Sequence, residues 1–149
     1  MFKSTFKKIT KSDIVNFENE LSTRIPEDYT EFLLTYNGGV VEPYIKVKVN
    51  DLSSYVNIDV IYGINTGNSN SDILTWTNKF SDDMLESSLI IADTLENGFI
   101  ILICTGEYKG VYYWDDSYHF DSSEDDMNTY FIADSFSDFL KIINECKNK

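Results

Sequence analysis

The sequence predicts an α+β domain: a twisted, mainly antiparallel sheet of about five to six strands with helices packed on its apolar face. Three observations predict it. Two amphipathic helices open the chain, short apolar segments joined by brief turns fill its middle, and another amphipathic helix closes it. Short connections between consecutive strands favour antiparallel pairing. The length of 149 residues suits one domain with a sizeable core, so we expect a single domain over residues 1–149.

The first predicted helix begins at Ser12, whose hydroxyl can cap it, and runs to about Ser22. Its apolar residues recur at helical spacing and form one stripe, made of Ile14, Phe17 and Leu21.

The second predicted helix occupies RIPEDYTEFLLTYNGG, residues 24–39. Pro26 suits its first turn, and Glu27 and Asp28 favour the positive end of the helix dipole. Four residues at helical spacing are expected to face the core: Tyr29, Phe32, Leu33 and Tyr36. The helix is expected to end at Asn37-Gly38-Gly39, because glycine adopts the left-handed conformation at little cost.

Several segments after this helix have the composition or alternation of strands, at residues 40–49, 55–64, 89–93, 99–104, 111–114 and 130–133. Pro43 predicts a sheet edge for the first of them, because proline has no N–H to donate to a neighbouring strand. Residues 99–104 are apolar enough to be a central strand buried on both faces, and Glu96-Asn97-Gly98 predicts the hairpin turn before them.

Two further helices are predicted. The first is capped by Ser71 or Asp72 and carries the apolar residues Ile73, Leu74, Trp76 and Phe80. The last begins at Ser135, which forms an S-x-x-D capping box with Asp138, and runs to about Cys146. The acidic run from Asp115 to Asn128 between the strands predicts a loop.

The charge narrows the possible partners. The formal net charge is −13, and residues 82–138 hold fourteen acidic residues against one base, Lys109. A chain this acidic is repelled by nucleic acid and by anionic membranes, so neither is expected as a direct partner. A basic protein is favoured instead, because complementary charge speeds encounter.

The sequence predicts a reduced, cytoplasmic protein. Its start, MFKSTFKKITKS, has no apolar core of a signal peptide, and the longest apolar run, Phe99–Cys104, is too short to cross a membrane. The two cysteines, Cys104 and Cys146, form no CxxC motif and no disulfide framework.

Few residues point to catalysis or to a cofactor. His119 is the single histidine, and a satisfied or exposed side chain is a better interpretation than a general base. Cys104 is better interpreted as a core residue than as a nucleophile. The run DDSYHFDSSEDD, Asp115–Asp126, lacks the glycine and closing glutamate of an EF-hand loop, so a solvated loop is favoured over a calcium site. We expect no metal, no cofactor and no enzymatic activity.

Three stretches together resemble the SUKH superfamily, which includes the Smi/Knr-like fungal cell-wall regulators. They are Ile25–Tyr29 continuing to Tyr36-Asn37-Gly38-Gly39; Ile90–Asp93 with Asn97-Gly98 and Gly110–Asp115; and Ala133–Phe136 with Phe139-Leu140. The chain departs from the family pattern at Ile90, where the family often has proline, and at Asp116, where it often has histidine.

The resemblance implies an immunity protein, because bacterial members commonly bind and neutralise a toxin, which is often a nuclease. An acidic face could occupy the cationic cleft of such an enzyme, with Trp114 and outward-facing tyrosines as apolar anchors. The expected partner-binding residues are Glu42, Tyr44, Tyr112, Trp114, Asp115, Asp116, Asp121, Glu124, Asp125 and Asp126.

Two other interpretations remain open. A regulatory scaffold of the kind found in the fungal relatives would use the same fold without a toxin. An enzyme would require the acids near His119 to converge in a pocket. For residues 112–114, a buried strand with one incidental exposed ring is the plainer alternative to an interface.

Overall fold

The computed structural model describes residues 2–115 and 128–147. Within them the chain forms an α+β fold with one seven-stranded sheet, whose strand order follows the sequence from β1 to β7 and whose neighbours are all antiparallel. The strands are β1 (Phe2–Thr5), β2 (Gly39–Val49), β3 (Ser54–Ile61), β4 (Ser88–Thr94), β5 (Gly98–Ile103), β6 (Gly110–Asp115) and β7 (Thr129–Ala133). The predicted fold class is confirmed, with a slightly larger sheet than expected.

Four α-helices accompany the sheet in the described residues: α1 (Lys11–Leu21), α2 (Glu27–Thr35), α3 (Ile73–Phe80) and α4 (Phe136–Lys147). Short 3-10 turns lie at η1 (Asn50–Leu52), η2 (Ser69–Ser71) and η3 (Ser81–Asp83). All four α-helices were predicted. The cap of α1 differs, because Thr10, not Ser12, accepts a hydrogen bond from the backbone N–H of Asp13 and closes a capping box with it.

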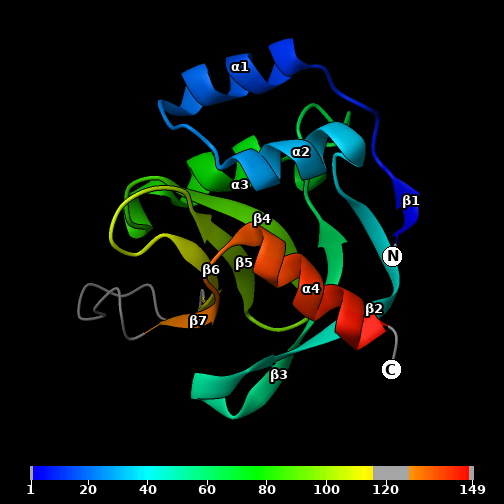
Figure 1. Cartoon of the computed structure of the whole chain (residues 1–149), viewed down its shortest axis with the longest axis vertical. Helices are drawn as coiled ribbons and strands as arrows, with labels where there is room; N and C mark the ends of the chain where they lie inside the picture. Colours follow the sequence, from blue (N-terminus) through cyan, green and yellow to red (C-terminus); the bar gives the residue numbers. More distant parts are fainter. Residues whose placement is uncertain (1, 116–127, 148–149) are drawn as a thin grey trace.

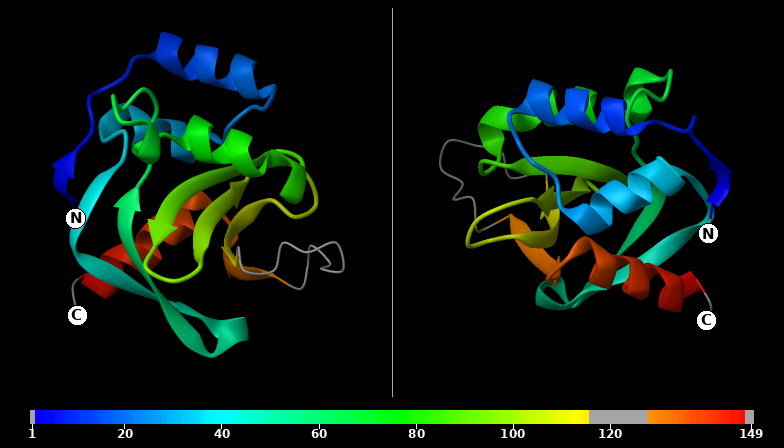
Figure 2. Two further views of the ribbon diagram at one scale, coloured as in Figure 1. Left: turned by 180° about the vertical axis from the view of Figure 1, so that it is seen from behind. Right: turned by 45° about the horizontal axis from the view of Figure 1, so that its top comes forward.

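Helices cover both faces of the sheet, whereas the sequence analysis expected them on one. Figures 1 and 2 show α2 and α4 on one side and α3 on the other, with α1 lying across the end beside α2 and α3. On one side, Phe136 of α4 contacts Tyr29 of α2, with ring centroids 4.6 Å apart. On the other, Trp76 of α3 packs on Phe99 of β5, with centroids 5.3 Å apart. As a result every residue of β5 is buried, as expected of a central strand.

Strand β1 was not predicted, because its sequence FKST has no apolar alternation. It forms by pairing with residues 39–41 at the start of β2. Its Phe2 ring also packs against Phe32 and Tyr36, with centroids 6.1 and 5.6 Å away. Tyr29, Phe32 and Leu33 are buried as predicted, but Tyr36 is exposed and packs its ring against Phe2 and Phe32 at the edge of the core.

Strand β2 as a whole is not an edge strand, since it pairs with β1 and with β3, but β1 pairs only with residues 39–41 and Pro43 lies beyond them. Pro43 lies where the register between β2 and β3 shifts, between Val40 and Ile45, and its peptide bond with Glu42 is cis. A bulge tolerates proline because a ladder hydrogen bond is already missing there.

Candidate protein-binding surface

A groove with mostly apolar walls opens on the face of the sheet that carries α3. It has a volume of about 460 Å³. Its walls come from η1, from the segment after η3, and from β5, β6, β7 and the turn between β5 and β6. We call it the aromatic groove, and it is lined by Asp51, Leu85, Ile103, Tyr108, Tyr112, Thr129 and Phe131.

The strand register places two aromatic rings of the groove, Tyr112 and Phe131, side by side. Tyr112 of β6 lies directly opposite Phe131 of β7, and the two rings meet edge to face with centroids 5.8 Å apart. The Tyr112 hydroxyl donates a hydrogen bond of 2.7 Å to the backbone carbonyl of Tyr108. Tyr108 and Phe131 remain 58% and 44% exposed. The groove therefore presents aromatic surface to solvent, and the rings of Tyr112 and Phe131 pack against each other within it.

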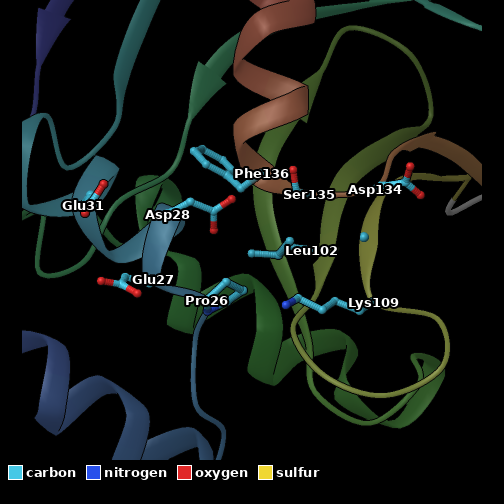
Figure 3. Close-up of a pocket in the computed structure, with 10 residues that line it drawn as sticks. Pro26, Glu27, Asp28, Glu31, Leu102, Lys109, Asp134, Ser135 and Phe136 are labelled. Carbon is cyan, nitrogen blue, oxygen red and sulfur yellow. The ribbon is translucent and has the colours of Figure 1, made fainter.

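A second depression, of about 410 Å³, lies on the opposite face between the start of α2 and the start of α4. Figure 3 shows Glu27, Asp28 and Glu31 on its α2 side, with Lys109 and Asp134 across from them. We call it the acidic cleft. Asp28 is committed to structure, because its carboxylate accepts hydrogen bonds of 2.9 Å from the backbone N–H and the hydroxyl of Ser137. It thereby ties α2 to α4.

The groove and the cleft approach each other where β6 begins and β7 ends. Gly110 lines the cleft, and a Cβ at this position would lie 2.8 Å from the carbonyl oxygen of Ala133 and 3.6 Å from the Tyr112 ring. Asp134 also lines the cleft. The pKa of Tyr112, which faces the groove, is raised by burial and further by the charge of Asp134. The negative charge of Asp134 therefore acts on an aromatic residue of the groove.

The expectation that Trp114 is an exposed anchor is wrong. Its side chain is only 2% exposed. The ring is packed between Phe80, at the end of α3, and Phe99 of β5, with centroids 5.3 and 6.3 Å away. Trp114 therefore belongs to the core, and Tyr112 is the residue of this strand that reaches a surface groove.

Two predicted residues, Glu42 and Tyr44, are exposed on β2, with β3, β4 and β5 between them and β6. The Glu42 carboxylate forms an ion pair of 2.6 Å with Lys3, and hydrogen bonding from Lys3 lowers its pKa. A basic partner would therefore compete with a residue of the same chain for this carboxylate.

Asp115 ends β6 half-buried, and its backbone N–H donates a hydrogen bond of 2.8 Å to the carbonyl of Asn128. The remaining predicted residues, Asp116, Asp121, Glu124, Asp125 and Asp126, lie outside the described residues, as does His119. Their assignment to the partner surface stays a prediction.

Cys104 is a core residue, as predicted. Burial raises its pKa to about 12, so the thiol keeps its proton at neutral pH. Across residues 2–115 and 128–147, His, Cys, Asp and Glu side chains form no group of three or more that could hold a metal ion. Within the same ranges no helix is both long and apolar enough to span a membrane.

Leu85, Tyr108 and Phe131 were not among the predicted partner-binding residues. They lie far apart along the chain, and only the sheet brings them together in one groove. The usable signal was Tyr108, because this large aromatic residue lies between Gly106 and Gly110, in a short polar stretch outside the strand-like segments.

Comparison with known proteins identifies one relationship. The model of the SMI1 / KNR4 family (SUKH-1) matches residues 8–142, a range that spans α1, α2, α3 and the first part of α4. No curated protein matches the chain.

Proposed function

Because the chain belongs to the SMI1 / KNR4 family (SUKH-1), we propose that it is an immunity protein, which binds a toxin made by its own cell or its kin and neutralises it. The observation that carries the proposal is the family match over residues 8–142, because bacterial members of this superfamily commonly have this role. The proposed mode of action is tight docking, with no reaction catalysed by the chain itself.

The charge of the chain supports a basic partner. The sequence holds 25 acidic residues against 12 basic ones. A nuclease is a fitting target, because its substrate cleft must be cationic to hold a polyanion. Electrostatic steering between opposite charges raises association rates toward ~10⁸–10⁹ M⁻¹s⁻¹ at low salt. The proposed complex therefore forms quickly, and its association rate falls as salt is added.

The test is co-expression with the protein encoded by the reading frame beside this gene, which the proposal expects to carry a toxin domain. Cells that express both proteins should survive, and the purified pair should bind with an association rate that falls between low and physiological salt. An unrelated protein of similar size and net charge serves as control, because it should not protect. If the toxin kills cells equally with and without this chain, immunity to that toxin is overturned, and a regulatory scaffold becomes the better interpretation of the family match.

A further inference from the structure

We propose that the aromatic groove is a docking site for an apolar side chain that is flanked by lysine or arginine residues on a protein partner. The inference rests on the proposed function, because it names the surface that would hold the proposed toxin and the chemistry this surface selects. Because Trp114 is buried, the residues proposed to contact the partner are the exposed ones of the aromatic groove.

The groove is large enough to take up a large apolar side chain, and its lining suits one. Its volume of about 460 Å³ lies within the range of roughly 300–1,000 Å³ typical of binding pockets. Leu85, 41% exposed, adds an aliphatic wall to the rings of Tyr108 and Phe131. Isolated exposed apolar residues are ordinary on protein surfaces, but their convergence on one groove indicates an interface.

The groove is also organised before any partner arrives. The hydrogen bond between the Tyr112 hydroxyl and the Tyr108 carbonyl fixes the ring of Tyr112 against the turn that carries Tyr108. The strand pairing of β6 with β7 fixes Phe131 beside Tyr112. Ordering side chains at an interface opposes binding, and the ring of Tyr112 is already ordered in the folded chain.

The charge around the groove selects the partner. Asp51 is the charged residue among those that line it, and Asp83 lines the small adjoining pocket that shares Leu85, Ile103 and Thr129 with it. Asp134, just after β7, adds a further negative charge, which contributes to the raised pKa of Tyr112. These carboxylates favour a lysine or arginine beside the inserted side chain, whereas an acidic partner would be repelled.

The first test measures affinity for the neighbouring toxin domain with matched variants. Tyr108→Ser and Phe131→Lys change exposed groove residues and should each weaken binding at least about tenfold, as the loss of an interface anchor does. Tyr55→Ser changes a tyrosine on β3 that is 53% exposed, close to the exposure of Tyr108, and should bind like the wild type. Circular dichroism and melting temperature confirm that each variant is folded.

The outcomes separate the two proposals. If the wild type does not bind the toxin, the proposed function fails. If the wild type binds and both groove variants bind equally well, the groove inference fails while the function stands. If Tyr44→Ser weakens binding and the groove variants do not, the interface lies on β2.

A second measurement does not depend on the toxin. Titration with free indole, followed by NMR, should shift the resonances of Leu85, Tyr108 and Phe131 in a saturable way, and Leu85→Asp should abolish the shifts. Shifts confined to other residues, or none, overturn the groove as a site for an apolar side chain. Sedimentation should show that the free protein is a monomer. If it is instead a dimer that Phe131→Lys dissociates, a second copy of the chain occupies the groove, and the proposal of a basic partner there is wrong.

Discussion

The side-chain amide of Asn37 and the backbone of Ile64 are joined by two hydrogen bonds, each 2.8 Å long. The Ile64 N–H donates to Oδ1 of Asn37, and Nδ2 of Asn37 donates to the Ile64 carbonyl. Nδ2 also donates to the carbonyl of Lys7, at 2.8 Å. Asn37 is completely buried and has a φ of 51°. One side chain thus joins the end of α2, the segment after β1 and the segment after β3.

We expect Asn37→Ala to lower the free energy of unfolding by about 2–4 kcal/mol, because it leaves buried backbone groups of Lys7 and Ile64 without partners. Urea denaturation measures the change. Asn37→Asp keeps the shape but replaces the amide donor with an acceptor that faces two carbonyls, so it should be comparably destabilising. Asn70→Ala, at an exposed asparagine, is the control and should change stability by less than about 0.5 kcal/mol. A small effect at Asn37 would show that its hydrogen bonds are replaceable by water.

Gly63 and Gly67 require glycine for two different reasons: Gly63 because of a close backbone contact, and Gly67 because of its backbone conformation. A Cβ at Gly63 would lie 2.1 Å from the carbonyl oxygen of Asn37, whereas a Cβ at Gly67 would meet nothing within 4 Å. Gly67 instead has a φ of +86°. We expect Gly63→Ala to cost more than 2 kcal/mol, as overpacking in a tight core does, and Gly67→Ala to cost about 1 kcal/mol through backbone strain. Thermal and urea unfolding of the two variants give the comparison. Equal losses would contradict the close approach at Gly63.

The helices, the hairpins and the fold class could be predicted because local signals determine them. Which of Tyr112 and Trp114 is buried and which reaches the surface could not be predicted. Residues two apart on a strand point to the same face, so alternation treats these two side chains alike. Their burial differs because Phe80, at the end of α3, packs against the ring of Trp114. The aromatic groove was missed for the same reason, since its position depends on where a distant helix ends.

Strand β1 shows a related limit. Its four residues carry no strand pattern of their own and pair because residues 39–41 offer a free edge. In contrast, part of the role of Asn37 could be predicted from the sequence. The sequence showed that the helix stops at Asn-Gly-Gly, and the structure adds that the asparagine side chain, rather than a glycine alone, holds the stop in place.

The burial of Trp114 leads to a prediction opposite to the one for an exposed anchor. Trp114→Ala should lower the free energy of unfolding by about 3–5 kcal/mol, as the loss of a large buried ring does. Urea denaturation followed by Trp76 fluorescence measures it. Trp114→Phe should recover part of the loss, because Phe80 and Phe99 keep an aromatic neighbour. If Trp114→Ala weakens toxin binding while its stability matches the wild type, then Trp114 lies in the interface after all.

Alkaline pH should destabilise the fold. Burial raises the pKa of Cys104 from its ordinary 9.0 to about 12, and burial also raises the pKa of Tyr29 well above its usual value. Above about pH 9 the unfolded chain releases the thiol proton while the native chain keeps it, so the native state binds more protons. The free energy of unfolding therefore falls as pH rises, by roughly 1.4 kcal/mol per pH unit for each fully shifted group. Below pH 9 these groups contribute no slope.

Urea denaturation at pH 8, 9, 10 and 10.5 tests this expectation, and Cys104→Ala isolates the thiol. That variant loses some packing at every pH, but its free energy of unfolding should fall less steeply between pH 9 and pH 10 than that of the wild type. Tyr29→Phe extends the test above pH 10. Because the buried Tyr29 hydroxyl has no hydrogen-bond partner among the described residues, removing it should also leave stability at pH 8 unchanged or slightly higher. If the free energy of unfolding falls equally with pH in all three proteins, neither Cys104 nor Tyr29 has a higher pKa in the native state than in the unfolded state.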